Sequence, residues 1–349
     1  MPGDKPGEPA MNILTIESTC DETAAAVVTD SLEVRGSAVA SQDELHEKFN
    51  GVVPEIAARA HVERILPVID LALERSQLSL SDIDAIAVAS CPGLAGSLLV
   101  GVVAAKTLCL ALDVPLISVN HVHAHIYACK IATGRDIFPC VGYVVSGGHT
   151  SLFDCPSAAE YNLLGGTIDD AAGEAFDKVA SMMSLPFPGG PAVSRAAVTG
   201  NRKAYQFPRS FIHDRDRLQF SFSGLKTAVR YAITGPGKVD FSKIELSEQQ
   251  IADICASFEE AVVDCLVAKA FHALKRTGHE RLCVGGGVAA NRRFREVLTE
   301  KCSASGVDLI IAPMELCTDN AVMGGIAVER LKAGNFESLD MQIHPGLVR

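Results

Sequence analysis

Three histidines alternate with small apolar residues in the segment 120–125, which reads Asn-His-Val-His-Ala-His. In a helix, residues four positions apart lie on one face, so His121 and His125 can share one metal ion while His123 points elsewhere. Imidazole is the commonest protein ligand for metal ions. The segment therefore predicts a metal site on a helix. The alternative is a polar helix start with exposed imidazoles.

A carboxylate is the natural third ligand, and Asp319 is the candidate. It follows a predicted buried strand at a predicted helix N-terminus, where the helix dipole keeps a carboxylate ionised. Two histidines and one carboxylate leave coordination positions open, which suits iron or zinc acting on a bound substrate. The alternative is that Thr318 and Asp319 only cap the helix. Val122 stands where the H-E-x-x-H pattern of zinc peptidases needs its glutamate, which argues against that class.

Two glycine-rich turns can bring the backbone close to a ligand. The segment 145–150 (Val-Ser-Gly-Gly-His-Thr) joins two predicted strands, and the glycines at 285–287 precede a predicted helix that begins near Asn291. Glycine admits close approach, and a helix N-terminus favours an anion. No Gly-Lys-Ser/Thr follows, so the second turn is not a P-loop. The alternatives are a tight hairpin and an ordinary strand-to-helix turn.

A third region offers polar contacts to a sugar. Asp177 lies on a predicted amphipathic helix that begins at Gly173, and its carboxylate can accept hydrogen bonds from a ribose or face solvent. The segment 186–191 (Pro-Phe-Pro-Gly-Gly-Pro) predicts a rigid loop, in which Gly190 leaves room for a base or a sugar.

The elements that must position these residues alternate between strands and helices. Predicted strands cover 12–17, 24–29, 33–40, 83–89, 116–119, 140–145, 150–154, 281–284 and 307–311. Predicted helices cover 54–73, 97–112 and 251–276, with others opening at the histidine segment and near 291, and a last one ending near 331.

Both halves of the chain open with a strand, a polar turn and a second strand, which indicates a weak internal duplication. This is the layout of the actin-like ATPase (ribonuclease H-like) α/β fold, with two duplicated lobes and a nucleotide and metal cleft between them. We expect a disordered extension at 1–11, lobes at 12–135 and 136–330, and a tail at 331–349 that packs back on the first lobe. Free amides in the two hairpin turns can hold phosphates.

Composition limits the class further. The 349 residues carry a net charge of −11, which disfavours a general nucleic-acid binder, although arginines cluster near 195–217 and 292–295. The 11 cysteines are scattered without a C-x-x-C, which favours free thiols in a reducing compartment. We expect no run long enough to span a membrane, and no signal or transit peptide, so a cytoplasmic protein is predicted.

Together the motifs resemble the TsaD family of tRNA N6-adenosine threonylcarbamoyltransferases, formerly called O-sialoglycoprotein endopeptidases. The matching stretches follow one another in family order at 17–23, 120–125, 145–150, 170–178, 188–191, 221–227, 285–292 and 318–320. They span residues 12 to 330, and the bacterial or organellar branch is favoured.

The resemblance implies a reaction and a set of ligands. The threonylcarbamoyl group passes from threonylcarbamoyl-adenylate to N6 of the adenosine beside the anticodon (position 37) in tRNAs that read codons starting with adenine, forming t6A and releasing AMP. It implies His121, His125 and Asp319 as ligands of Fe²⁺, with Zn²⁺ as the alternative. It places the nucleotide (the adenylate, AMP or ATP) on Val145, Ser146, Gly147, Gly148, His149, Asp177, Gly190 and Asn291.

The same resemblance implies partners: a TsaB-like paralogue, a TsaE-like ATPase and the tRNA, with no membrane. At a charge of −11 the isolated chain is expected to bind tRNA weakly. No general base is evident, and His149 and Glu22 are the candidates. His123 adds an imidazole that can compete as a ligand, and Ser194 stands where some members carry an acid near the sugar.

Four other functions stay open from the residues alone. An O-carbamoyltransferase of the same fold would act on a substrate other than tRNA. An ATPase or sugar kinase of this fold would also act without tRNA, but it would give the histidine pair no role. A metallopeptidase is disfavoured by Val122, and a scaffold would leave the metal group unexplained.

Overall fold

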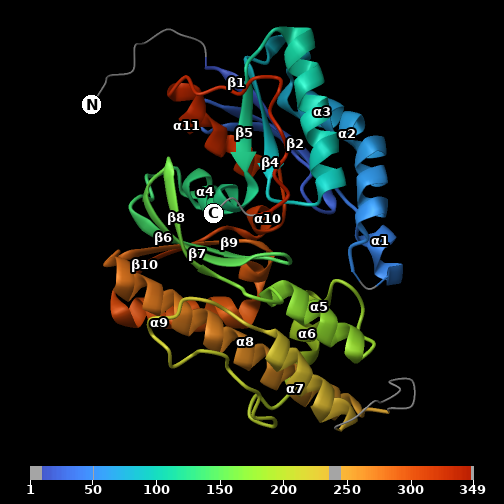
Figure 1. Cartoon of the computed structure of the whole chain (residues 1–349), viewed down its shortest axis with the longest axis vertical. Coiled ribbons are helices and arrows are strands. Elements are labelled where there is room, and N and C mark those ends of the chain that lie inside the picture. The colour runs from blue at the N-terminus through green and yellow to red at the C-terminus, as the bar shows by residue number, and fades with distance from the viewer. Residues whose placement is uncertain (1–9, 50, 236–244, 347–349) are drawn as a thin grey trace. The chain divides into compact units, whose positions relative to one another are not determined.

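The computed structural model describes residues 10–49, 51–235 and 245–346 (Figure 1). Its contacts divide the chain into two compact units. Unit 1 takes the described residues within 1–42, 53–127 and 319–349, and unit 2 those within 43–52 and 128–318. Most of the predicted N-terminal extension lies outside the described residues, and the predicted lobe boundaries and the cleft between the lobes stay predictions.

Unit 1 is built on a five-stranded sheet in the order β3-β2-β1-β4-β5. β1 and β2 form the expected hairpin, and β1, β4 and β5 run parallel, so the carboxyl ends of these three strands meet at one edge. The strands are β1 (Asn12–Glu17), β2 (Glu22–Thr29), β3 (Val34–Ser41), β4 (Ala85–Cys91) and β5 (Leu116–Asn120).

Two long helices, α2 (Pro54–Ser76) and α3 (Ala95–Leu112), pack on this sheet. α2 has proline in its first turn, and Gln77, the residue after its last one, takes the left-handed conformation in which helices commonly end. The buried cluster joins both helices to the sheet through residues such as Ile65 and Val102. α4 (His121–Thr133) begins directly after β5, which sets the histidines at the carboxyl edge of the sheet.

α3 overturns one expectation from the sequence. With 18 residues and a mean hydropathy of 2.0, it is long and apolar enough to span a membrane by length and composition. Leu98 and Val102 face the sheet, whereas Leu99, Val103 and Leu110 are exposed. A helix packed on the sheet of a globular unit passes the same test, so this one helix carries no conclusion about membranes.

Unit 2 repeats the strand plan of unit 1. Its sheet has the order β10-β9-β6-β7-β8, with an antiparallel β6-β7-β8 meander and parallel β6, β9 and β10. Read from the other edge, this is the order and direction found in unit 1, which confirms the predicted duplicated α/β class. The strands are β6 (Cys140–Val145), β7 (Thr150–Ser157), β8 (Glu160–Gly166), β9 (Arg281–Gly285) and β10 (Asp308–Ile311).

The helices of unit 2 are dominated by the long α8, whose capping box at Ser247 fixes its start and whose face packs in the core. The short α1 also belongs to this unit. The bounds are α1 (Asp43–His46), α5 (Ala172–Met182), α6 (Gly189–Ala196), α7 (Ser223–Thr234), α8 (Glu248–Thr277), α9 (Arg292–Ser305) and α10 (Met314–Cys317).

Sequence reasoning missed five strands or α-helices of unit 2 and misplaced one helix of unit 1. β8, α7 and the short α1 and α10 were not predicted, and the expected rigid loop at 186–191 contains the start of α6 at Gly189. The glycines hid this start because glycine is a weak helix former, yet Pro188 before it suits a helix entry. The last helix, α11 (Ala327–Lys332), begins later than Thr318, after a 3-10 turn at 322–326.

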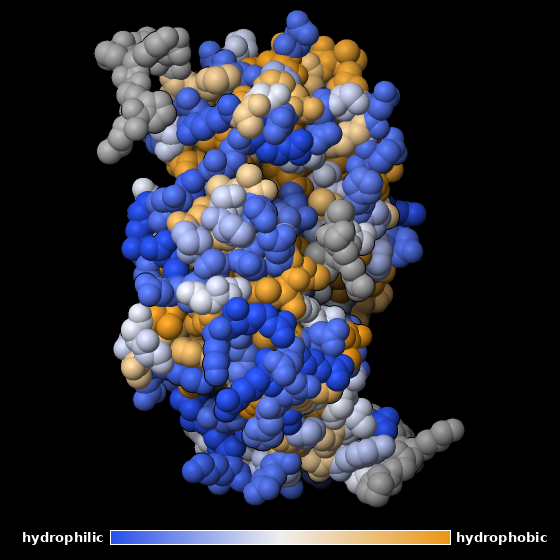
Figure 2. Space-filling model, turned by 60° about the vertical axis from the view of Figure 1, so that its left-hand side comes forward, coloured by the Kyte–Doolittle hydropathy of each residue, from blue (hydrophilic) through white to orange (hydrophobic). Residues whose placement is uncertain are grey.

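The C-terminal segment lies within unit 1. The Lys106 ammonium donates to the Met341 carbonyl over 2.6 Å, and the His344 amide donates to Ser90 over 2.9 Å. Met341 and Ile343 pack against the buried cluster. All 11 cysteines are free thiols, and nine are buried, in keeping with the expected reduced state. On the face drawn in Figure 2, hydrophilic side chains predominate and hydrophobic ones stand between them.

Candidate metal centre and nucleotide-binding residues

The start of α4 positions the histidine pair. Asn120 ends β5, and its side-chain oxygen accepts the amides of Val122 and His123 at 3.0 and 3.1 Å. This cap satisfies amides that a helix start leaves unpaired, and it turns the chain from strand into helix at once. His121 and His125 then lie one helical turn apart on the same face, as the spacing predicts.

The structure brings His121, His125 and Asp319 together within unit 1. The nearest ligand atoms all lie within 4.8 Å of one another. Asp319 Oδ1 lies 3.1 Å from His125 Nε2 and 3.5 Å from His121 Nε2, and the two imidazole rings meet nearly edge to face. Both histidines are buried, whereas the Asp319 side chain is 17 % exposed. Across the described residues, no other group of three such side chains meets the same spacing.

These distances fit a bound divalent ion. Zinc–nitrogen and zinc–carboxylate bonds are about 2.0–2.2 Å, so ligands at tetrahedral or octahedral angles stand about 3.0–3.5 Å apart. The two carboxylate-to-imidazole distances fall in that range. Two imidazoles and one carboxylate are also a common donor set for zinc and iron. The residues present therefore fit a metal.

Two residues of the β1–β2 turn hold His121 from its other side. Glu17 Oε2 and Thr19 Oγ1 lie 3.1 and 3.2 Å from His121 Nδ1, and the Thr19 amide donates to the other Glu17 oxygen over 2.7 Å. With Nδ1 held in this way, Nε2 faces Asp319. A carboxylate behind a histidine ligand fixes its orientation and makes it a better donor to a metal.

The charge around His121 is strongly negative. Burial opposes protonation of the ring, but Asp319 and Glu17 outweigh it and raise the pKa of His121 to about 9. His123, by contrast, lies off this face, and burial lowers its pKa to about 4. His123 is not among the atoms that the metal-ligand spacing groups together.

Asp319 is not the helix cap that the alternative interpretation required. It lies between α10 and the 3-10 turn at 322–326, and Asn320 takes the capping role by accepting the Met323 amide at 3.1 Å. The Asp319 carboxylate points to the histidines instead.

In unit 2 the turn at 145–150 packs on the start of α5. The Ser146 amide donates to the His149 carbonyl over 2.7 Å, which closes the turn. The amides of Gly173 and Glu174 donate to the carbonyls of Ser146 and Gly147 over 3.2 and 3.1 Å. A side chain at 173 would collide with this turn, since its Cβ would lie 2.7 Å from Gly147 Cα. The glycine is needed for the contact.

The glycine loop after β9 packs against the turn at 145–150. Gly286 has a φ of +95°, and a Cβ on it would lie 2.5 Å from the Val145 carbonyl oxygen. Gly147 and Gly148 are exposed, and a Cβ on either would meet nothing within 4 Å. The backbone of this turn is therefore open to a ligand on one side and supported on the other.

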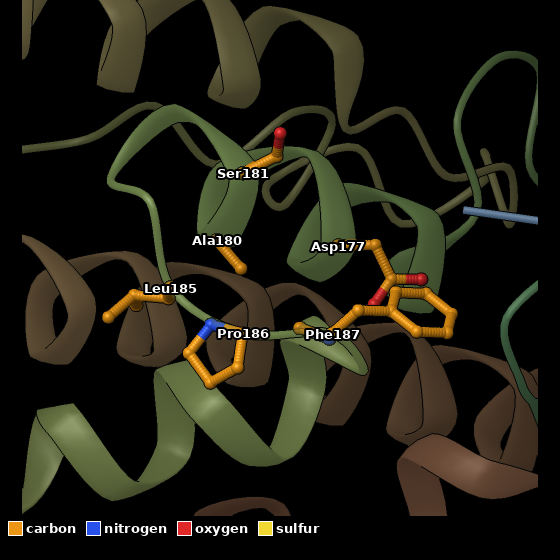
Figure 3. Close-up of a pocket in the computed structure, with 7 residues that line it drawn as sticks. Asp177, Ala180, Ser181, Leu185, Pro186 and Phe187 are labelled. Atoms are coloured by element: carbon orange, nitrogen blue, oxygen red, sulfur yellow. The ribbon is translucent and has the colours of Figure 1, made fainter. Parts of the chain in front are cut away.

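Asp177 does not simply face solvent. Its carboxylate accepts the Gly189 amide at 2.8 Å and so satisfies an unpaired amide at the start of α6. Figure 3 shows Asp177 beside the ring of Phe187, over a small hollow that Leu185 and Pro186 also line. Gly190 follows at the first turn of α6, with open space where a Cβ would stand.

Asn291 belongs to a polar group that the sequence did not reveal. Its oxygen accepts the Phe294 amide and caps α9, and its Nδ2 donates to Glu259 Oε1 over 2.8 Å. Ser194 Oγ donates to the same Glu259 oxygen over 2.8 Å. Glu259 is a buried residue of α8. An acid at a core-facing position of an otherwise apolar stripe was the signal that could have found it.

The two candidate bases lie on the two hairpins. Glu22 opens β2 opposite Ser41 in unit 1, and His149 closes the β6–β7 turn in unit 2. No structural feature of either assigns it a base role, so both stay predictions.

Two matching sheets and a buried His-His-Asp group define an enzyme-like protein of the actin-like ATPase fold. Full-length HypF, solved in a phosphate- and nucleotide-bound form, has this fold: it aligns with a TM-score of 0.61 and 16 % identity over 94 % of this chain and 56 % of its own. A family model described as TsaD, tRNA N6-adenosine threonylcarbamoyltransferase, matches residues 33–326. The chain belongs to the TsaD family.

Curated relatives carry the same activity in their names. A tRNA N6-adenosine threonylcarbamoyltransferase from Rhodopirellula baltica is 60 % identical over 97 % of both chains. One from Anaeromyxobacter dehalogenans is 48 % identical over 90 % of this chain and 92 % of its own. The recognition of the family from its motifs is confirmed, and the chain is an enzyme of the tRNA-modifying transferase class.

Proposed function

We propose that this chain transfers the threonylcarbamoyl group from threonylcarbamoyl-adenylate to N6 of adenosine 37 in tRNAs that read codons starting with adenine. The N6 amine attacks the carbamoyl carbon, the bond from that carbon to the phosphate oxygen breaks, AMP leaves, and N6 gives up a proton. Membership of the family carries this proposal. The buried His-His-Asp group supports it, because a non-metal role leaves that group unexplained.

His121, His125 and Asp319 would hold one divalent ion, Fe²⁺ in the first instance and Zn²⁺ as the alternative. When bound, such an ion polarises and orients donor oxygens as a Lewis acid. Glu17 and Thr19 keep the His121 ring turned so that Nε2 faces the ion. His123 stays outside the coordination shell in this proposal.

The residues of unit 2 would bind the nucleotide part of the donor. The turn at 145–149 offers backbone amides without side chains in the way, and Gly190 leaves room for the sugar or base. Asp177 and Asn291 hold the starts of α6 and α9 in place. AMP is a good leaving group, so much of the rate would come from positioning. Glu22 and His149 are the candidates to accept the N6 proton.

Partners complete the proposal: the tRNA, a TsaB-like paralogue and a TsaE-like ATPase, in the cytoplasm. Several arginines of the two clusters noted in the sequence form ion pairs. Arg202 and Arg293 contact Glu260, and Arg209 contacts Asp264. At a net charge of −11 the chain would bind tRNA weakly without help.

The exposed apolar side chains of α2 and α3 are the surface on which we propose that the TsaB-like paralogue binds. Val62 and Leu66 on α2, and Leu99 and Val103 on α3, each stand four residues apart and are more than half exposed. The two helices pack against each other, since a Cβ on Gly96 would lie 3.0 Å from Ala58 Cβ, one turn before these residues. Charge substitution at Leu99 and Val103 should abolish co-purification with the paralogue, whereas Val198→Glu, at a still more exposed site in unit 2, should not.

The activity is tested with threonylcarbamoyl-adenylate, unmodified tRNA and the partner proteins, reading modified adenosine by mass spectrometry. Formation of t6A that depends on this chain supports the proposal. Absence of t6A together with carbamoyl transfer to another acceptor, or with ATP hydrolysis alone, would favour the other functions of this fold.

A further inference from the structure

The group formed by Glu259, Ser194 and Asn291 joins three helices of unit 2. Glu259 comes from α8, Ser194 from α6 and Asn291 from the start of α9. Ser194 Oγ and Asn291 Nδ2 both donate to Glu259 Oε1, each at a distance of 2.8 Å. A weaker contact of 3.4 Å links Asn291 Nδ2 to Ser194 Oγ. A carboxylate that is only 2 % exposed needs such donors to offset the loss of water.

These bonds fix the direction of each donor. The Asn291 oxygen is taken by the Phe294 amide, so its NH₂ group must face Glu259. The Ser194 hydroxyl donates its only hydrogen to Glu259, so its oxygen can take part in further hydrogen bonds only as an acceptor. A charged acceptor behind a hydroxyl makes the hydrogen bond stronger and polarises the oxygen.

Ser194 also has a side that a ligand can reach. It is half-buried, and it stands four residues after Gly190, so both lie on one face of α6. The space beside Gly190 is open, since a Cβ there would meet nothing within 4 Å. An oxygen that can only accept, beside open space, matches a ligand hydroxyl that donates.

We propose that Glu259 is a positioning residue that holds Ser194 Oγ as the acceptor for a ribose hydroxyl of the bound nucleotide and fixes Asn291 beside it. This inference rests on the proposed nucleotide site of unit 2 and adds a residue to it. Glu259 itself need not touch the nucleotide; it acts through Ser194.

The test compares binding of AMP with that of 2′-deoxy-AMP and 3′-deoxy-AMP by calorimetry on the full chain. The native protein should prefer AMP over at least one deoxy analogue by about 10-fold, the usual worth of one hydrogen bond. Ser194→Ala and Glu259→Ala should each lower this preference to about 1-fold, while affinity for that deoxy analogue stays within about 2-fold. Glu259→Gln, which keeps one acceptor, should retain part of it.

The double variant Ser194→Ala, Glu259→Ala should lose no more preference than either single variant, because both changes remove one interaction. Glu260→Ala is the matched control: it adjoins Glu259 on α8 but pairs with Arg293, and it should keep the native preference. Melting curves identify a variant that fails to fold. If Glu259→Ala does not fold, the test rests on Ser194→Ala, which changes a half-buried residue and should still fold.

Two results would overturn the inference while the proposed nucleotide site stands: a native protein that binds AMP and both deoxy analogues equally, or variants that keep the full preference. If the native chain binds no adenine nucleotide at all, the proposed site in unit 2 fails first, and this inference fails with it.

Discussion

The two candidate sites are built by different means. In unit 1 the candidate metal group consists of three side chains, two of them buried, and Glu17 holds one of them, His121, from behind. In unit 2 the candidate site at 145–149 consists mostly of backbone, and its two glycines are exposed. The site in unit 1 should therefore lose its function when a ligand side chain is removed. The site in unit 2 should lose its function when the residues packed behind its backbone are displaced.

The largest effect is expected from removing a ligand. His125→Ala should abolish stoichiometric metal binding and lower t6A formation by at least about 100-fold, because two ligands cannot hold the ion in place. Metal analysis of the purified protein and the tRNA assay check this. His123→Ala is the control, and loss of the metal in that variant instead would mean that the wrong imidazole was chosen.

The next effect tests the residue behind the ligand. Glu17→Gln should weaken metal affinity by about 10- to 100-fold, because outer carboxylates orient and activate histidine ligands to that degree. Competition with a chelator measures it. The fold should persist, since Gln keeps the size of the side chain, and nucleotide binding by unit 2 should not change. An unaltered metal affinity would reduce Glu17 to a packing role.

The backbone site is tested by adding one methyl group. Gly173→Ala should cost about 1–3 kcal/mol of folding free energy, because the Cβ would lie 2.7 Å from both Gly147 Cα and the Ser146 oxygen. It should also weaken AMP binding as the turn is pushed away from α5. Gly147→Ala has open space and should leave stability within about 0.5 kcal/mol. Equal melting points for the two variants would contradict the support role.

The smallest effect is a pH dependence in unit 2. Asp170 lies 2.7 Å from Lys178 and 2.6 Å from Lys226; burial tends to raise its pKa, but the two ammonium groups outweigh this and lower it below 3.8. A lowered native pKa gives stability that is present above the unfolded value and lost as pH falls through the native one. Asp170→Asn should therefore cost about 1 kcal/mol at pH 7, kept small because water screens the half-exposed Lys178.

Unfolding in denaturant at several pH values checks this last prediction. The difference between native protein and Asp170→Asn should shrink below about pH 4. A difference that stays constant with pH would mean that the carboxylate acts through shape and not through charge.

The sequence by itself determined whatever depends on near neighbours. Spacing of four put His121 and His125 on one helix face, and apolar runs between turns marked nine of the ten strands in the described residues. These features follow from backbone geometry within a few residues. The motif set also identified the family, because many short matches in order are far more specific than any one of them.

Only the tertiary structure decided which distant side chains meet. Asp319 is 194 residues from His125, and local sequence left its capping and ligand roles equally open until Asn320 was found to be the cap. Glu17 behind His121 and Glu259 behind Ser194 could not be assigned from spacing, because such contacts depend on how sheets and helices pack. Buried polar groups need partners, but only the folded chain determines which partners they find.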